Sequence, residues 1–171
     1  MSWLVLLLLP ALVLGFWWWR RLMLGRLATA VSADNPLMLA AYDQARASLP
    51  EAAALLARGE EVAVKFPLSN SVGEIEHVWG VVHEFGEQSL EVSVVTQLIS
   101  GPTPEGPMSV SRQVVEDWQA FLSDGSGIRG GFSTQAQLAI CRNLKLPIPR
   151  ALDQQGPEFL DTFIHPKKQT I

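Results

Sequence analysis

Hydrophobic and polar positions divide the chain into one long apolar run and a later part built of short periodic segments. No side chain is charged between residues 3 and 19, and arginines follow directly. Seventeen apolar residues in a helix span roughly 26 Å, close to the ~30 Å hydrocarbon core of a bilayer. The pattern therefore predicts a transmembrane anchor over residues 1–27. Its expected interfacial residues are Trp3, Trp17, Trp18, Trp19, Arg20 and Arg21.

A secretory signal peptide is the alternative for this first segment. It would carry positive charge before the apolar run, whereas Arg20, Arg21 and Arg26 all follow it. Residues 28–30 and 31–33 resemble cleavage sites, but they lie beyond the paired arginines. The positive-inside rule places the folded part in the cytoplasm, with a periplasmic domain as the alternative. We therefore expect a single-pass membrane protein that contacts the lipid bilayer through its first helix.

Helical patterning begins after this run. Residues 34–36 (Asp-Asn-Pro) combine a capping side chain with a proline suited to the first helical turn, and predict a helix to about Ser48. Residues 48–51 start a second helix, which Gly59 ends. We expect residues 28–59 to form a helical linker region whose two helices pack on the sheet that follows.

From Glu61 the hydrophobic period changes to two. Alternation predicts strands over residues 61–68, 75–82 and 89–98, and the short links between them indicate an antiparallel meander. Beyond a rigid loop at 101–107, spacing typical of a helical stripe predicts a short helix that holds Val114, Val115, Trp118 and Phe121.

The remaining segments complete the predicted architecture. Residues 123–131 are glycine-rich and are expected to form a flexible loop, and a last helix is expected to start at Ser133. The tail over residues 147–171 is expected to be loosely ordered. The fold class is therefore α+β: a small antiparallel sheet of about three or four strands with packed helices over residues 60–146, preceded by one N-terminal transmembrane helix.

Charge and cysteine content narrow the classes of partner. The net charge of −4 conceals a split, because beyond residue 30 there are 10 basic and 17 acidic residues. An acidic domain without a basic stripe repels a phosphate backbone, so we expect no nucleic-acid partner. The single cysteine, Cys141, excludes an intrachain disulfide framework and a cysteine-based metal cluster. We expect no cofactor.

The stretch Gly73–Gly86 carries the most suggestive side chains. On a strand, Glu76 and His77 point to opposite faces, so they cannot chelate one ion together. His77 and His83 share a face, but roughly 20 Å separates them. We therefore predict no metal site. Both faces of this strand are apolar in its middle, which is typical of a central strand covered on both sides, so Trp79 is interpreted as a core residue.

Other residue sets leave several functional possibilities open. Glu76, His77 and Asp117 are candidate acid–base groups of an enzyme. The candidates for contact with a ligand or partner are Lys65, Trp79 and Trp118. The sequence shows no nucleophile elbow and no phosphate-binding loop spacing.

Four short blocks carry a family resemblance: Val64–Phe66, Glu76–Trp79, Glu116–Trp118 and Gly130–Ser133. In order and spacing they resemble the YegJ-like family of bacterial proteins, whose shared domain has no established function. The resemblance covers roughly residues 60–144. It implies a small α+β domain and no established activity. A glycine–aspartate step often found before the third block is Gly-Pro here, at residues 106–107, so no role for that acid is carried over.

The family blocks allow a structural and a functional interpretation. In the first, Trp79 and Trp118 pack together, and Asp117 caps a helix or accepts an indole N–H. In the second, Glu76, His77 and Asp117 meet a ligand or a peptide in a surface groove. The predicted anchor and the compact acidic domain without a recognisable catalytic set favour a membrane-anchored binding or adaptor module for another protein. The alternatives are a structural component of the envelope and an enzyme that uses those three side chains.

Overall fold

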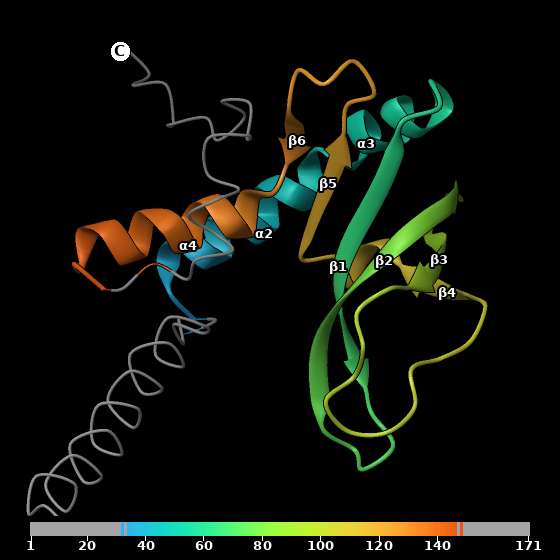
Figure 1. Ribbon diagram of the computed structural model, residues 1–171, viewed down its shortest axis with the longest axis horizontal. Coiled ribbons are helices and arrows are strands. Elements are labelled where there is room, and N and C mark those ends of the chain that lie inside the picture. The colour runs from blue at the N-terminus through green and yellow to red at the C-terminus, as the bar shows by residue number, and fades with distance from the viewer. Residues whose placement is uncertain (1–31, 33, 147, 149–171) are drawn as a thin grey trace, which may run out of the picture.

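The computed structural model describes residues 32, 34–146 and 148 (Figure 1). The expected anchor over residues 1–27 lies outside these residues, as does nearly all of the expected tail over 147–171. Within the described part of the chain, none of the helices has both the length and the apolar character needed to cross a bilayer. The fold class predicted from the sequence is corrected on the sheet, as follows.

One sheet of six strands forms the centre of the domain, in the order β4-β3-β2-β1-β5-β6, and every neighbouring pair is antiparallel. The strands are β1 (Glu61–Ser69), β2 (Ile75–Phe85), β3 (Ser89–Val94), β4 (Pro107–Ser111), β5 (Asp117–Phe121) and β6 (Ile128–Gly130). The expectation of three or four strands was therefore wrong. The predicted meander is confirmed for β1, β2 and β3.

The sequence pattern did not reveal the three shortest strands. The stretch expected as a helix around Trp118 instead forms β4, a short 3-10 turn (Arg112–Val114) and β5. Its apolar residues match a helical stripe, yet Trp118 and Ala120 also alternate correctly for a strand, and both are buried. Pairing of β5 with β1, with Trp118 opposite Val64, decides between the two patterns. The loop expected over 123–131 likewise contains β6.

Three helices occur among the described residues: α2 (Pro36–Ala47), α3 (Leu49–Ala57) and α4 (Phe132–Asn143). The predicted cap of the first is confirmed, because Asn35 Oδ1 accepts a hydrogen bond of 3.0 Å from the backbone N–H of Leu37. Ser48 separates α2 from α3, and its hydroxyl donates to the carbonyl of Gln44. The helix α4 begins one residue before the expected Ser133.

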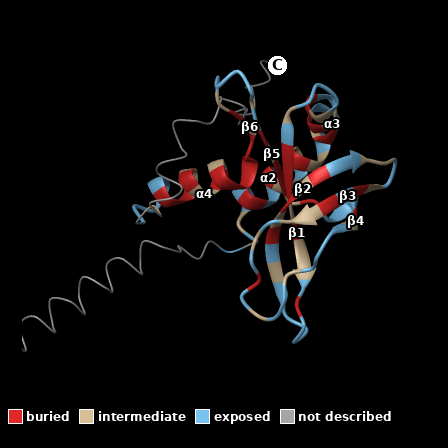
Figure 2. Cartoon of the chain, turned by 45° about the vertical axis from the view of Figure 1, so that its right-hand side comes forward, coloured by how far each residue is buried: buried red, intermediate tan, exposed pale blue. Residues whose placement is uncertain are grey.

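The helices pack against β1 and β5 on one face of the sheet and form the core with it (Figure 2). As predicted, α2 and α3 pack on the sheet rather than leading away from it. Their contribution to the core consists of Met38, Ala41, Ala45, Leu49, Ala52 and Leu55. The strands contribute mainly Val62, Val64, Phe66, Val78, Val82, Leu90, Val92, Trp118 and Ala120.

The other face of β2 carries Trp79, and its interpretation as a core residue was wrong. Val78 and Val82 are buried in the core, whereas Trp79 and Val81 are half-buried on the opposite side of the strand. Both faces of β2 are apolar, as the sequence indicates, but only the face of Val78 and Val82 belongs to the core of the described residues. Trp79 therefore lies on the uncovered face of the sheet, beside Lys65 of the neighbouring strand.

Candidate functional site

Asp117 caps the helix α4 from outside that helix. It is fully buried at the start of β5, and Gly131, which precedes α4, offers no side chain for capping. Asp117 Oδ1 instead accepts a hydrogen bond of 2.9 Å from the backbone N–H of Phe132, and Oδ2 accepts one of 2.8 Å from that of Ser133. The Ser133 hydroxyl adds a bond of 2.6 Å. These bonds satisfy backbone donors that the first helical turn leaves free.

Glycine allows the strand before α4 to lie against β5. A Cβ at Gly130 would lie 2.2 Å from the carbonyl oxygen of Trp118 and 2.8 Å from its ring, and Gly130 has a φ of +78°. The Gly131 N–H donates to the same carbonyl at 2.7 Å. The ring of Phe132 then meets the Trp118 ring edge to face at 5.8 Å. The third and fourth sequence blocks thus form one packing unit.

Two opposing effects set the pKa of the Asp117 carboxyl group. Burial raises its pKa to about 6, while hydrogen bonds from Ser133, Trp118 and Phe132 act to lower it. All these donors belong to the fold itself. The carboxyl group has no exposed surface from which to exchange a proton with a substrate. The predicted helix-capping role of Asp117 is confirmed.

Glu76 fixes a loop. Its carboxylate accepts hydrogen bonds of 2.7 Å from the Ile99 N–H, 3.1 Å from the Ser100 N–H and 2.8 Å from the Asn70 side chain. The bond from Asn70, followed by that from Ile99, lowers the pKa of Glu76. The carboxylate therefore holds the segment after β3 against the start of β2. Acid–base chemistry would require these bonds to break.

His77 has a charged partner that the sequence did not indicate. Its Nδ1 lies 2.7 Å from Oε2 of Glu116, and the side chains are 47% and 14% exposed, respectively. Glu116 directly precedes the Asp-Trp pair, so its position in that block was the one available signal. Glu116 also contributes, after burial, to the raised pKa of Tyr42 on α2.

The structure does not bring the three candidate acid–base groups together. Glu76 binds the loop, His77 pairs with Glu116 at the surface, and Asp117 is buried at the start of α4. Among the described residues there is also no group of three or more potential ligands placed to hold a metal ion.

The candidate binding residues divide between the two faces of the sheet. Lys65 and Trp79 are paired across β1 and β2 on the uncovered face. Trp118 lies in the core, and its indole N–H donates to the Ser48 hydroxyl at 2.9 Å. The expected packing of Trp79 against Trp118 was therefore wrong, because alternation places them on opposite faces.

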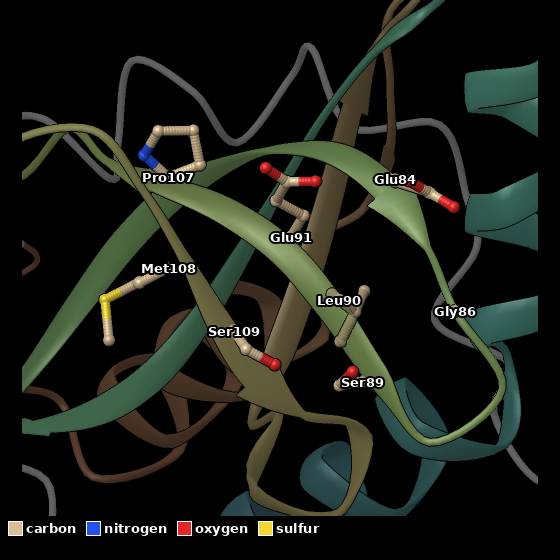
Figure 3. A pocket seen from close by; sticks show the side chains of 8 residues that line it. All are labelled: Glu84, Gly86, Ser89, Leu90, Glu91, Pro107, Met108 and Ser109. Atoms are coloured by element: carbon tan, nitrogen blue, oxygen red, sulfur yellow. The ribbon is translucent and has the colours of Figure 1, made fainter.

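A hollow of about 370 Å³ lies where β2, β3 and β4 meet (Figure 3). It contains two carboxylates, those of Glu84 and Glu91, beside the edge strand β4. The residues that line it are Glu84, Gly86, Ser89, Leu90, Glu91, Pro107, Met108 and Ser109. None of these residues was singled out from the sequence. Their combination depends on the pairing of β3 with β4, which the sequence pattern did not predict.

Comparison with known proteins adds no relative. A scan against models of protein families finds no match, and neither do searches of curated proteins and of solved structures. The resemblance to the YegJ-like family therefore stays a prediction. The functional argument rests on the geometry of the chain itself.

Proposed function

We propose that the α+β domain is a protein-binding module that takes up an extended segment of its partner as an additional strand beside β4. The observation that carries this proposal is the outer edge of β4, with which no strand pairs in the described part of the chain and which lies next to a hollow. The opposite edge, β6, has three residues and leads directly into α4. Strand addition at an open edge is a recurring mode of peptide recognition.

The backbone of β4 offers groups to such a strand. In an antiparallel pair, successive residues direct their N–H and C=O groups alternately toward the partner strand and away from it. The Arg112 N–H donates to the carbonyl of Gln88 next to β3, so Ser111 and Ser109 direct theirs outward. Both serines are exposed. Pro107, which lacks an N–H, limits the free donors of the strand to its second half.

The expected affinity of the backbone pairing alone is modest. Each hydrogen bond contributes about 0.5–1.5 kcal/mol net, and the short edge offers few of them. Much of this gain offsets the loss of freedom on association. Side chains of the added strand must therefore provide further contacts, and the hollow beside β4 is available to receive them.

The acid–base enzyme is less well supported than a binding module. Its three residues are separated and serve the fold, as described above for Glu76 and Asp117. No comparable observation favours a purely structural component of the envelope.

The proposal is tested with a photo-crosslinking amino acid in place of the exposed Pro107 in the full-length chain, in cells. Crosslinked proteins are identified, and binding of the contacting segment to the purified chain is then measured by fluorescence anisotropy. Ser109→Pro removes an outward N–H and is expected to abolish binding. Ser109→Thr keeps that N–H and is the matched control. Equal binding by both folded variants would refute strand addition at β4.

A further inference from the structure

Two glutamates occupy neighbouring positions at the end of the β2–β3 ladder. Glu84 and Glu91 are direct cross-strand partners, just beyond a register shift between Val82 and Glu84. Both side chains are exposed, and neither forms an ion pair or hydrogen bond with another described residue. Like charges directly opposite in a sheet are destabilising, so the pair has a cost to the isolated fold.

The two glutamates lie in a cross-strand row that leads to the edge strand β4. Glu84 pairs with Glu91, and Glu91 pairs in turn with Ser109 of β4. Figure 3 shows these three side chains around the hollow that the ends of the strands enclose. A strand added beside β4 would place one residue next in this row, about 4.8 Å beyond Ser109 and roughly 10 Å from Glu91.

The chemistry of this row suits a cation. A lysine or arginine at that position has a long apolar stem that can cross Ser109 and bring its charge to the two carboxylates. The surroundings have the same sign, because Glu87 and Glu105 are exposed in the neighbouring turn and loop. Arg112, a cation near the end of β4, already donates to the carbonyls of Gly86 and Glu87.

We propose, on the basis of the strand addition described above, that the partner segment is basic and places a lysine or arginine opposite Ser109, with its charge in the hollow between Glu84 and Glu91. The edge of β4 then pairs with the backbone of the segment, and the two glutamates favour a segment that carries a positive charge. The side chains of the partner segment alternate between the two faces of the extended sheet. One side chain on the face of Glu84 and Glu91 is cationic.

Three synthetic peptides test this proposal against the full-length chain. Each has nine residues, of which eight alternate between threonine and valine and the central one is lysine, glutamine or glutamate. Binding is measured by fluorescence anisotropy at low ionic strength. Two exposed ion pairs contribute about 1 kcal/mol together, so the lysine peptide is expected to bind roughly fivefold more tightly than the glutamine peptide. The preference should weaken at 1 M salt, where charges are screened within about 3 Å.

Variants without the two carboxylates test whether these groups cause the preference for the lysine peptide. Glu84→Gln combined with Glu91→Gln is expected to remove the preference for lysine and to leave binding of the glutamine peptide unchanged. The control is Glu61→Gln combined with Glu51→Gln, which makes the same change of charge at exposed positions of β1 and α3 and should keep the preference. Thermal unfolding monitored by circular dichroism confirms that each variant is folded.

The outcomes separate this proposal from the one on which it rests. Equal affinity for the lysine and glutamine peptides, with binding lost in Ser109→Pro, overturns the basic-segment proposal and retains strand addition. Binding that Ser109→Pro leaves intact overturns strand addition. Failure of all three peptides to bind at millimolar concentration overturns both proposals.

Discussion

The buried Asp117 allows a quantitative prediction about pH. Its carboxyl group has a pKa of about 6 in the folded chain, compared with 3.8 for an ordinary aspartate. Between these two values the folded chain holds a proton that the unfolded chain has released. The free energy of unfolding therefore falls as pH rises from about 4 to about 6, and levels off above that. The sign is opposite to that of an aspartate stabilised by an ion pair.

The size of the effect follows from the difference between the two pKa values. Each unit corresponds to about 1.36 kcal/mol, so this single group changes the free energy of unfolding by ~2–3 kcal/mol between pH 4 and pH 7. Asp117→Asn cannot titrate and should lack this component. The variant also turns an N–H donor toward the backbone N–H of Ser133 and is expected to be less stable throughout.

The assay is urea unfolding of the wild-type chain and of Asp117→Asn at half-unit steps from pH 4 to pH 7. The stability difference between them should shrink by ~2–3 kcal/mol as pH rises. Asp124→Asn is the control, because hydrogen bonding from Ser126 lowers the pKa of the exposed Asp124 and moves its titration below this range. Stability curves of wild type and Asp117→Asn that run parallel across the whole range would refute the reasoning.

Three further substitutions test the packing described above. Gly130→Ala forces a Cβ against the carbonyl of Trp118 at a positive φ and should cost about 2–4 kcal/mol, measured by thermal unfolding; an unchanged midpoint would contradict the close approach. Glu76→Gln loses acceptor capacity for the loop over residues 95–101, so amide hydrogen exchange there should accelerate while that of β1 does not. His77→Ala breaks a partly exposed pair and should cost at most about 1 kcal/mol by chemical denaturation; a larger loss would show that the pair is more important than its exposure indicates.

Local rules predicted the first half of the described fold well. The cap at Asn35 and the glycine after α3 bracket two helices, and period-two alternation marks β1, β2 and β3. These signals lie within a few residues of the elements that they specify. Local patterning was therefore sufficient for that part.

The second half depends on contacts between distant residues. The strands β4, β5 and β6 have three to five residues each, too few for alternation to be distinguished from a helical stripe. Pairing with β1 and β3 determines the conformation of β5 and β4. For the same reason, the sequence marked Glu76 and Asp117 as candidate functional residues but did not show their roles. Glu76 binds a loop, and Asp117 caps a helix.

The hydrogen bond from Trp118 to Ser48 bears on which fragment of the chain can fold alone. The family resemblance predicted from the sequence begins near residue 60, and a fragment cut at that boundary would lack α2 and α3. The indole N–H would lose its acceptor, and the apolar surface that Met38, Ala45 and Leu55 cover would meet water. An exposed face of that kind favours aggregation. The smallest autonomous folding unit therefore begins at or before Asn35, well ahead of the four blocks that carry the resemblance.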